Sequence, residues 1–120
     1  MNHRELGDCV IEQLKDVEGV IRIVLFGSVC NGTYTPNSDI DIAGIIDDSK
    51  KNHPAKDIEG MPTYLRKKVD TVIRLVPNPN GIPVNVSLFW DSEYKQGIRL
   101  YGNKGRSDLL HEVGDTVYEV

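Results

Sequence analysis

The sequence predicts one α/β (α+β) domain that spans residues 1–120, and three observations predict it. Residues 4–17 repeat apolar side chains at helical spacing. Residues 20–26 form a β-branched apolar run that is typical of a buried strand. Two further apolar runs, 39–46 and 82–90, are expected to add strands to the same sheet. The chain length suits one continuous core and is too short for two.

Turn-forming residues separate the first elements. The expected first helix carries its apolar side chains on one face: Leu6, Val10, Leu14 and Val17. Gly19 ends this helix, and the strand that follows stops at Gly27-Ser28. Residues 29–34 are long enough only for a short helix or turn, and residues 35–38 are rich in turn formers. The chain is then expected to re-enter the sheet.

The middle of the chain permits two interpretations. Residues 47–60 are polar and predict a surface loop. Residues 61–76 carry apolar side chains at helical spacing, with Pro62 allowed in the first turn, and they predict a helix. The β-rich composition of residues 69–76 also permits a strand that forms a hairpin with the next one. The helix is favoured because its apolar face is continuous.

The last third of the chain predicts a strand and a short helix. In the strand expected over 82–90, Pro83 must lie at the start or on a sheet edge, because proline has no N–H for the ladder. The tail begins at Ser107, which is interpreted as a helix cap. Leu109, Leu110 and Val113 then follow at helical spacing.

Composition and charge exclude several classes of function. No apolar run approaches the roughly 20 residues that cross a bilayer, so no membrane partner is expected. A formal net charge of -4 argues against a broad nucleic-acid interface, which needs a basic surface. Residues 2–8 lack the features of a secretory signal, and the cytoplasm is therefore expected. Cys9 and Cys30 are expected to be reduced thiols.

Two short motifs carry the chemistry. Gly27-Ser28 follows a strand, where backbone N–H groups and a hydroxyl can meet phosphate oxygens at close range. Asp39 and Asp41 alternate along a strand, so both point to one face and can ligate Mg²⁺. Each motif alone is more often an ordinary turn or a solvated strand face. Their order along the chain brings both to one end of a sheet, which predicts a metal-dependent phosphate site.

These residues resemble the signature of the minimal nucleotidyltransferases of the DNA polymerase β superfamily. The resemblance rests on Leu25-Phe26-Gly27-Ser28, on Gly32 and on Ser38-Asp39-Ile40-Asp41-Ile42. It extends over most of the chain, because the ending from Leu110 to Glu119 is similar in character to the C-terminal helix and short strand of that family. The resemblance implies a small mixed β-sheet flanked by helices.

The same resemblance implies a reaction and its site. Asp39 and Asp41 would be the catalytic, metal-binding residues. Gly27 and Ser28 would contact a nucleoside triphosphate, and ATP is the one expected. An acceptor hydroxyl would attack the α-phosphorus and expel pyrophosphate. Metal ions on carboxylates can activate the attacking oxygen and stabilise the leaving one, which agrees with this chemistry.

One departure from the family concerns its third carboxylate. Residues 81–86 resemble the strand that carries it, with Asn85 where an aspartate is expected. An asparagine offers one oxygen but cannot act as a general base. A rival alignment uses residues 69–72 as that strand, with Asp70 as the third carboxylate. Asn85 is favoured, because helical spacing over 61–76 competes with the strand.

Other polar and aromatic candidates are interpreted as structural. The basic cluster Arg66-Lys67-Lys68 is more often a solvated helix face than a phosphate contact. Trp90 at the end of an apolar strand is expected to pack. The three histidines lack the spacing of a metal cluster: His3, His53 and His111.

Two functions from different classes follow. The leading hypothesis is an Mg²⁺-dependent enzyme that transfers a nucleoside monophosphate from a nucleoside triphosphate to a hydroxyl on a small molecule or protein. Because 120 residues suit the minimal core alone, the acceptor is expected on another copy or another chain. The resemblance implies a helical HEPN protein, in a toxin–antitoxin pair, as that partner. The alternative is a binding module that kept the fold but lost turnover, and Asn85 motivates it.

Overall fold

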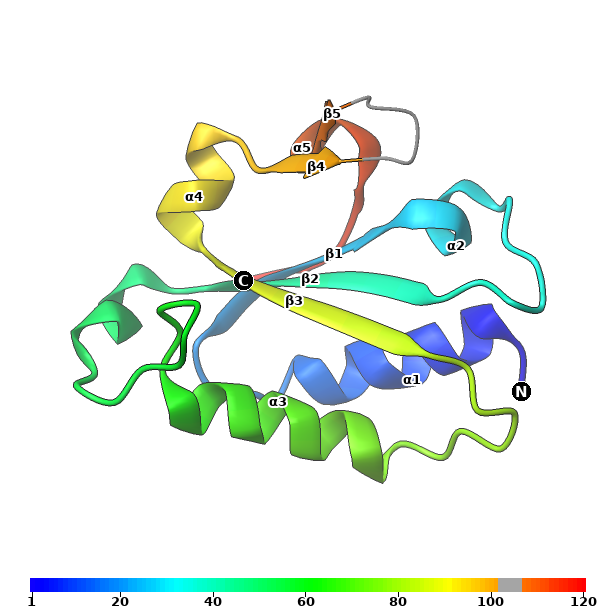
Figure 1. Cartoon of the computed structure of the whole chain (residues 1–120), viewed down its shortest axis with the longest axis horizontal. Coiled ribbons are helices and arrows are strands. Elements are labelled where there is room, and N and C mark those ends of the chain that lie inside the picture. The colour runs from blue at the N-terminus through cyan, green and yellow to red at the C-terminus, as the bar shows by residue number, and fades with distance from the viewer. Residues whose placement is uncertain (102–106) are drawn as a thin grey trace.

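The computed structural model describes residues 1–101 and 107–120 (Figure 1). The first half contains α1 (His3–Leu14), β1 (Val20–Phe26), α2 (Gly27–Asn31), β2 (Ile40–Ile46) and the 3-10 helix η1 (Asp48–Asn52). The second half contains α3 (Thr63–Leu75), β3 (Val84–Trp90), α4 (Asp91–Gln96), β4 (Arg99–Tyr101), β5 (Ser107–Leu109), α5 (Leu110–Val113) and β6 (Asp115–Glu119). Among the described residues, no helix is both long and apolar enough to cross a membrane.

The central sheet is mixed. It has four strands in the order β3-β2-β1-β6. β1 is antiparallel to both β2 and β6, whereas β2 and β3 are parallel. Strands β4 and β5 form a separate antiparallel pair. The predicted α/β class, with a small mixed sheet flanked by helices, is confirmed.

The two faces of the sheet are covered differently. Helices α1 and α3 lie beneath it in Figure 1, while α4, α5 and the β4–β5 pair lie above it. The core on the α1–α3 side includes Leu6, Val10, Leu14, Ile23, Leu25, Ile40, Ile42, Leu65 and Val69. A smaller cluster on the other side contains Val24, Ala43, Ile45, Ile98 and Leu110. Because strand side chains alternate, neighbouring residues of β1 and β2 supply the two clusters in turn.

The middle of the chain settles the choice between helix and strand. α3 covers Thr63–Leu75, so the helix is confirmed and the alternative strand over residues 69–76 is wrong. Leu65 and Val69 are buried on this helix, which shows that the apolar stripe outweighed the β-rich composition. The expected loop over residues 47–60 contains the short helix η1.

Strand β3 begins directly after Pro83 at the edge of the sheet, as its missing N–H requires. The tail differs from the prediction. Ser107 begins strand β5, and the N-cap residue of the four-residue helix α5 is Leu109. Apolar spacing over so short a stretch cannot distinguish a strand followed by one helical turn from a longer helix. α4 follows β3 without having been predicted.

Candidate active site

Strand register gathers three polar side chains at the start of β2. Asp41 is paired with Phe26 on β1 and with Asn85 on β3. Ile40 and Ile42 are fully buried in the core on the α1–α3 side. The intervening Asp41, and Asp39 before it, therefore face the opposite side of the sheet. The predicted neighbours, strands 20–26 and 39–46, do lie side by side.

The side-chain amide of Asn85 bridges the two carboxylates. Its Nδ2 lies 3.1 Å from Oδ2 of Asp39 and 3.5 Å from Oδ1 of Asp41. A carboxylate only accepts hydrogen bonds, so the NH₂ group of Asn85 must face the pair. Within residues 1–101 and 107–120, no group of three or more histidine, cysteine or acidic residues could hold a metal ion. Asn85 is therefore the neutral third member of this group, hydrogen-bonded to Asp39 and, at the longer distance, to Asp41.

Gly27 brings the Gly-Ser motif into direct contact with Asp41. Its φ angle is +76°, in the left-handed region that glycine adopts without strain. A Cβ built at this position would overlap with Oδ2 of Asp41. Only a glycine backbone can therefore lie this close to the carboxylate. Ser28 follows as the second residue of α2 and is half-buried.

The surroundings of Asp41 shift the pKa of its carboxyl. Partial burial raises the pKa of the Asp41 carboxyl above its ordinary value. The hydrogen bond from Asn85 lowers this pKa, and the negative charge of Asp39 raises it further. Burial is the largest of these effects, so the net direction is upward.

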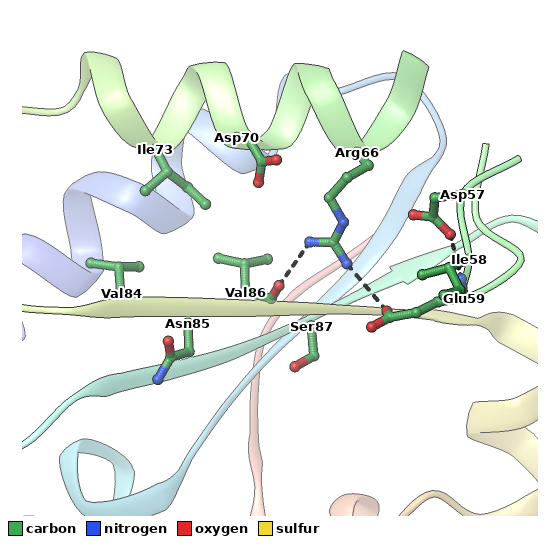
Figure 2. Close-up of a pocket in the computed structure, with 10 residues that line it drawn as sticks. All are labelled: Asp57, Ile58, Glu59, Arg66, Asp70, Ile73, Val84, Asn85, Val86 and Ser87. Atoms are coloured by element: carbon green, nitrogen blue, oxygen red, sulfur yellow. Dashed lines mark hydrogen bonds and ion pairs between the residues drawn. The ribbon is translucent and has the colours of Figure 1, made fainter. Parts of the chain in front are cut away.

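Asp70 lies away from this site. It is exposed on α3, whereas Asn85 points from β3 toward the other side of the sheet (Figure 2). Both residues border a pocket of about 590 Å³ between α3 and the edge strand β3. Asp70 enters that pocket from the helix side, with strand β3 between it and the side chain of Asn85. The rival alignment with Asp70 as third carboxylate is wrong.

The basic cluster of α3 is only partly a solvated face. Lys67 and Lys68 are exposed as expected. Arg66, by contrast, donates from Nη1 to the carbonyl oxygen of Val86 at 3.0 Å, and its Nη2 lies 3.8 Å from Oε2 of Glu59 (Figure 2). These contacts hold α3 against the edge of β3, so Arg66 stabilises the fold.

Trp90, His53 and His3 each have structural contacts. Trp90 is buried, as its packing interpretation predicts. His53 and Ala55 form a local turn, with the Nδ1 of His53 within hydrogen-bond distance of the backbone of Ala55. His3 is buried and contacts the backbone of Ser38, directly before Asp39. No local pattern in the sequence indicates this contact, because the two residues are 35 positions apart.

The donor set suits a hard divalent cation. Asp39 and Asp41 present carboxylate oxygens on one face, and rotation of the Asn85 amide about its last side-chain torsion would present a third oxygen, Oδ1. Oxygen ligands of this kind are those that Mg²⁺ takes in proteins, while keeping room for phosphate oxygens. The same edge of the site is bounded by Gly27, where backbone can approach closely.

Two solved structures are similar to this chain. A candidate nucleotidyltransferase from Sulfolobus solfataricus is similar over 77% of this chain and 70% of its own, with 19% identity and a TM-score of 0.45. The cyclic dinucleotide synthase CdnE of Elizabethkingia meningoseptica, solved with GTP and Apcpp, is similar over 88% of this chain, with 19% identity and a TM-score of 0.49. This chain spans only 46% of that synthase.

Comparison with curated proteins gives no significant match. The nucleotidyltransferase domain family matches residues 8–96, a range that contains Gly27-Ser28, both aspartates and Asn85. By that match, the chain belongs to the nucleotidyltransferase domain family.

Proposed function

We propose that residues 1–120 form a single nucleotidyltransferase domain that transfers a nucleoside monophosphate from a nucleoside triphosphate to a hydroxyl acceptor. Asp39 and Asp41 hold Mg²⁺, and Gly27 and Ser28 contact the triphosphate. One observation carries the proposal. The backbone of Gly27 lies against the carboxylate of Asp41, so a phosphate-binding turn and a pair of cation ligands meet at one end of the sheet.

Each residue has a defined task in this proposal. When bound, Mg²⁺ supplies positive charge that neutralises the triphosphate and activates the attacking hydroxyl. The backbone N–H groups of Gly27 and Ser28 donate to phosphate oxygens, and Asp39 and Asp41 would hold the cation beside those phosphates. The acceptor hydroxyl gives its proton to solvent water, and its oxygen bonds to the α-phosphorus as the bond to pyrophosphate breaks. Asn85 can orient the acceptor by hydrogen bonding but cannot take its proton.

The acceptor and partners belong to the same proposal. A small molecule or a protein hydroxyl serves as acceptor, and a second polypeptide, either a HEPN-type helical protein or another copy, holds it. An antitoxin-like role follows if the partner is a toxin. The net charge of -4 suits a small anionic ligand neutralised by metal better than a long nucleic acid. A cytoplasmic location remains part of this proposal.

A second function is favoured by a specific observation. The Asn85 amide bonds to both carboxylates, which gives the pair a neutral partner without a cation. A domain that binds nucleotide weakly and lacks a general base would act as a binding module. Turnover distinguishes it from the enzyme, because a module binds nucleotide or a partner without releasing pyrophosphate.

Calorimetric titration with ATP and Mg²⁺ tests the metal site. Asp39→Asn and Asp41→Asn each remove one charged ligand, so ATP affinity should fall at least about tenfold in either variant. Asp70→Asn makes the same change of charge on α3 and should bind like the wild type. Equal affinity in all four proteins, or equal affinity with and without Mg²⁺, would refute the proposed site. Labelled ATP incubated with a co-purified partner then distinguishes transfer from binding.

A further inference from the structure

His3 is the one polar or charged side chain that the fold buries, among the residues whose burial the structure describes. It is only 5% exposed. Its Nε2 lies 2.8 Å from the carbonyl oxygen of Ser38. A carbonyl oxygen can only accept, so Nε2 carries the proton. The ring also packs against Tyr34, with ring centroids 5.0 Å apart. This buried ring therefore connects the start of α1 to the segment that enters β2.

The segment that His3 holds is a closed turn. The amide of Ser38 donates to the carbonyl of Thr35 at 3.0 Å, and the amide of Thr35 donates to Oγ of Ser38 at 2.9 Å. The amide of Asn37 donates to Oγ1 of Thr35. These hydrogen bonds link residues 35–38 to one another, so a contact at Ser38 restrains the whole turn.

Asp39 lies between two residues that α1 restrains. Ser38 is held by His3 on one side. On the other side Ile40 is fully buried, its amide donates to the carbonyl of Pro83 at 2.9 Å, and a Cβ at Gly7 would lie 3.7 Å from its Cγ2. α1 therefore packs closely against the start of β2 at Gly7.

The start of α1 is itself well defined. Oδ1 of Asn2 accepts from the amide of Glu5 at 2.8 Å, and Oε1 of Glu5 accepts from the amide of Asn2 at 3.4 Å. This reciprocal capping box fixes the first turn of the helix. His3 projects from a rigid turn, so its hydrogen bond can impose a position on the main chain that it contacts.

We infer that His3 is a positioning residue of the site: it anchors the Ser38 carbonyl from the helical side of the sheet and so fixes Asp39 for cation and nucleotide binding. The inference rests on the proposed function of Asp39. His3 does not contact the substrate in this role. It restrains the backbone next to the ligand, and loss of the restraint lets Asp39 leave the position in which it shares a cation with Asp41.

Three variants separate this role from general stability. His3→Phe keeps a ring against Tyr34 but removes the donor. His3→Gln restores a side-chain N–H close to the place of Nε2. Ile11→Val removes one methylene from the buried face of the same helix, remote in sequence from the turn, and is the matched control for loosening α1.

Hydrogen exchange in the metal-free protein gives the first readout. In His3→Phe the amides of Thr35, Ser38 and Ile40 should exchange about fivefold faster than in the wild type, the factor expected for one lost hydrogen bond. His3→Gln should restore most of their protection, and Ile11→Val should not single out these amides. Unchanged exchange in His3→Phe, or an equal change in Ile11→Val, would overturn the inference.

The second readout is the affinity for ATP with Mg²⁺. It should fall about fivefold in His3→Phe and recover in His3→Gln. If the wild type itself does not bind, the proposed function fails, and exchange alone decides whether His3 anchors the turn. Should His3→Phe not fold, the nitrogen-15 shifts of His3 in the wild type decide: a proton on Nε2 supports the anchor, and an unprotonated Nε2 contradicts it.

Discussion

Asn85 and Asp41 are direct partners across the parallel ladder between β2 and β3, with the amide nitrogen of Asn85 3.5 Å from Oδ1 of Asp41. In the proposed site, a neutral donor therefore stands where a third carboxylate would join Asp39 and Asp41. In the absence of a cation the amide reduces the repulsion between Asp39 and Asp41, since it bonds to both. With a cation present, the same residue supplies at most one uncharged oxygen.

Asn85→Asp should raise the rate of nucleotidyl transfer above that of the wild type. A correctly placed general base contributes about 10²–10⁴-fold, so transfer measured with labelled ATP should rise within that range. Without Mg²⁺ the variant should melt at a lower temperature than the wild type, because three carboxylates then share one site.

Ser87→Asp provides the control for that gain. Ser87 lies two residues further along β3 on the same face, paired with Ala43 and away from the start of β2 (Figure 2). A new carboxylate there changes the net charge equally but cannot complete the ligand set. Equal rates in the two variants, or no gain in Asn85→Asp, would show that the position of Asn85 does not limit transfer.

Gly27→Ala should abolish metal-dependent nucleotide binding, and Gly32→Ala should not. Both glycines have positive φ angles, +76° and +73°, so alanine costs about 1–2 kcal/mol of conformational strain at either position. Only at Gly27 does the added Cβ overlap with the Asp41 carboxylate, whereas at Gly32 the added Cβ would meet open space among the described residues. Titration of both variants with ATP and Mg²⁺, together with their melting temperatures, separates the two effects. A loss of affinity equal in both would mean that strain alone is responsible.

Much of the site could be predicted from the sequence because its geometry follows strand periodicity. Alternation along residues 39–42 is enough to place Asp39 and Asp41 on one face, with Ile40 and Ile42 opposite. The position of Asn85 was also predictable once residues 61–76 were taken as a helix, since that left 82–90 as the partner strand.

Other features depend on contacts that are distant in the sequence. The hydrogen bond between His3 and Ser38 joins residues 35 positions apart, and no local pattern encodes it. The contact of Arg66 with Val86 likewise appears only when α3 lies against β3. In the tail, strand β5 and the single turn of α5 are each too short for periodicity to distinguish them.

Arg66→Ala should lower stability and leave nucleotide affinity unchanged. The guanidinium extends from α3 and donates to the carbonyl of Val86 on the edge strand, on the side of that strand opposite to the side chain of Asn85. Its loss removes a charge-assisted hydrogen bond, which is worth about 1.5–3 kcal/mol, and that value is an upper limit here because the side chain is partly exposed. Urea unfolding and ATP titration of the same samples provide the test, with Lys67→Ala as the exposed neighbour. Reduced ATP affinity in Arg66→Ala at unchanged stability would instead make Arg66 a phosphate ligand.

Asp41→Asn should stabilise the metal-free protein at neutral pH, and the size of that gain should depend on pH. The folded-state pKa of Asp41 is raised, chiefly by burial, so the native state binds this proton more tightly than the unfolded chain does. Below the ordinary aspartate value of about 3.9 both states are protonated, and ionisation of Asp41 costs no stability. As pH rises from there through the raised folded pKa, ionisation of Asp41 lowers the stability of the folded protein, and above that pKa this loss of stability is complete.

The melting temperature of Asp41→Asn minus that of the wild type should therefore increase through this window and then level off, with Asp70→Asn as the control for net charge. Protons compete with Mg²⁺ for the same carboxylate, so in the wild type the affinity for ATP with Mg²⁺ should fall as pH decreases through the folded pKa. A difference in melting temperature that shrinks as pH rises would contradict the raised pKa of Asp41.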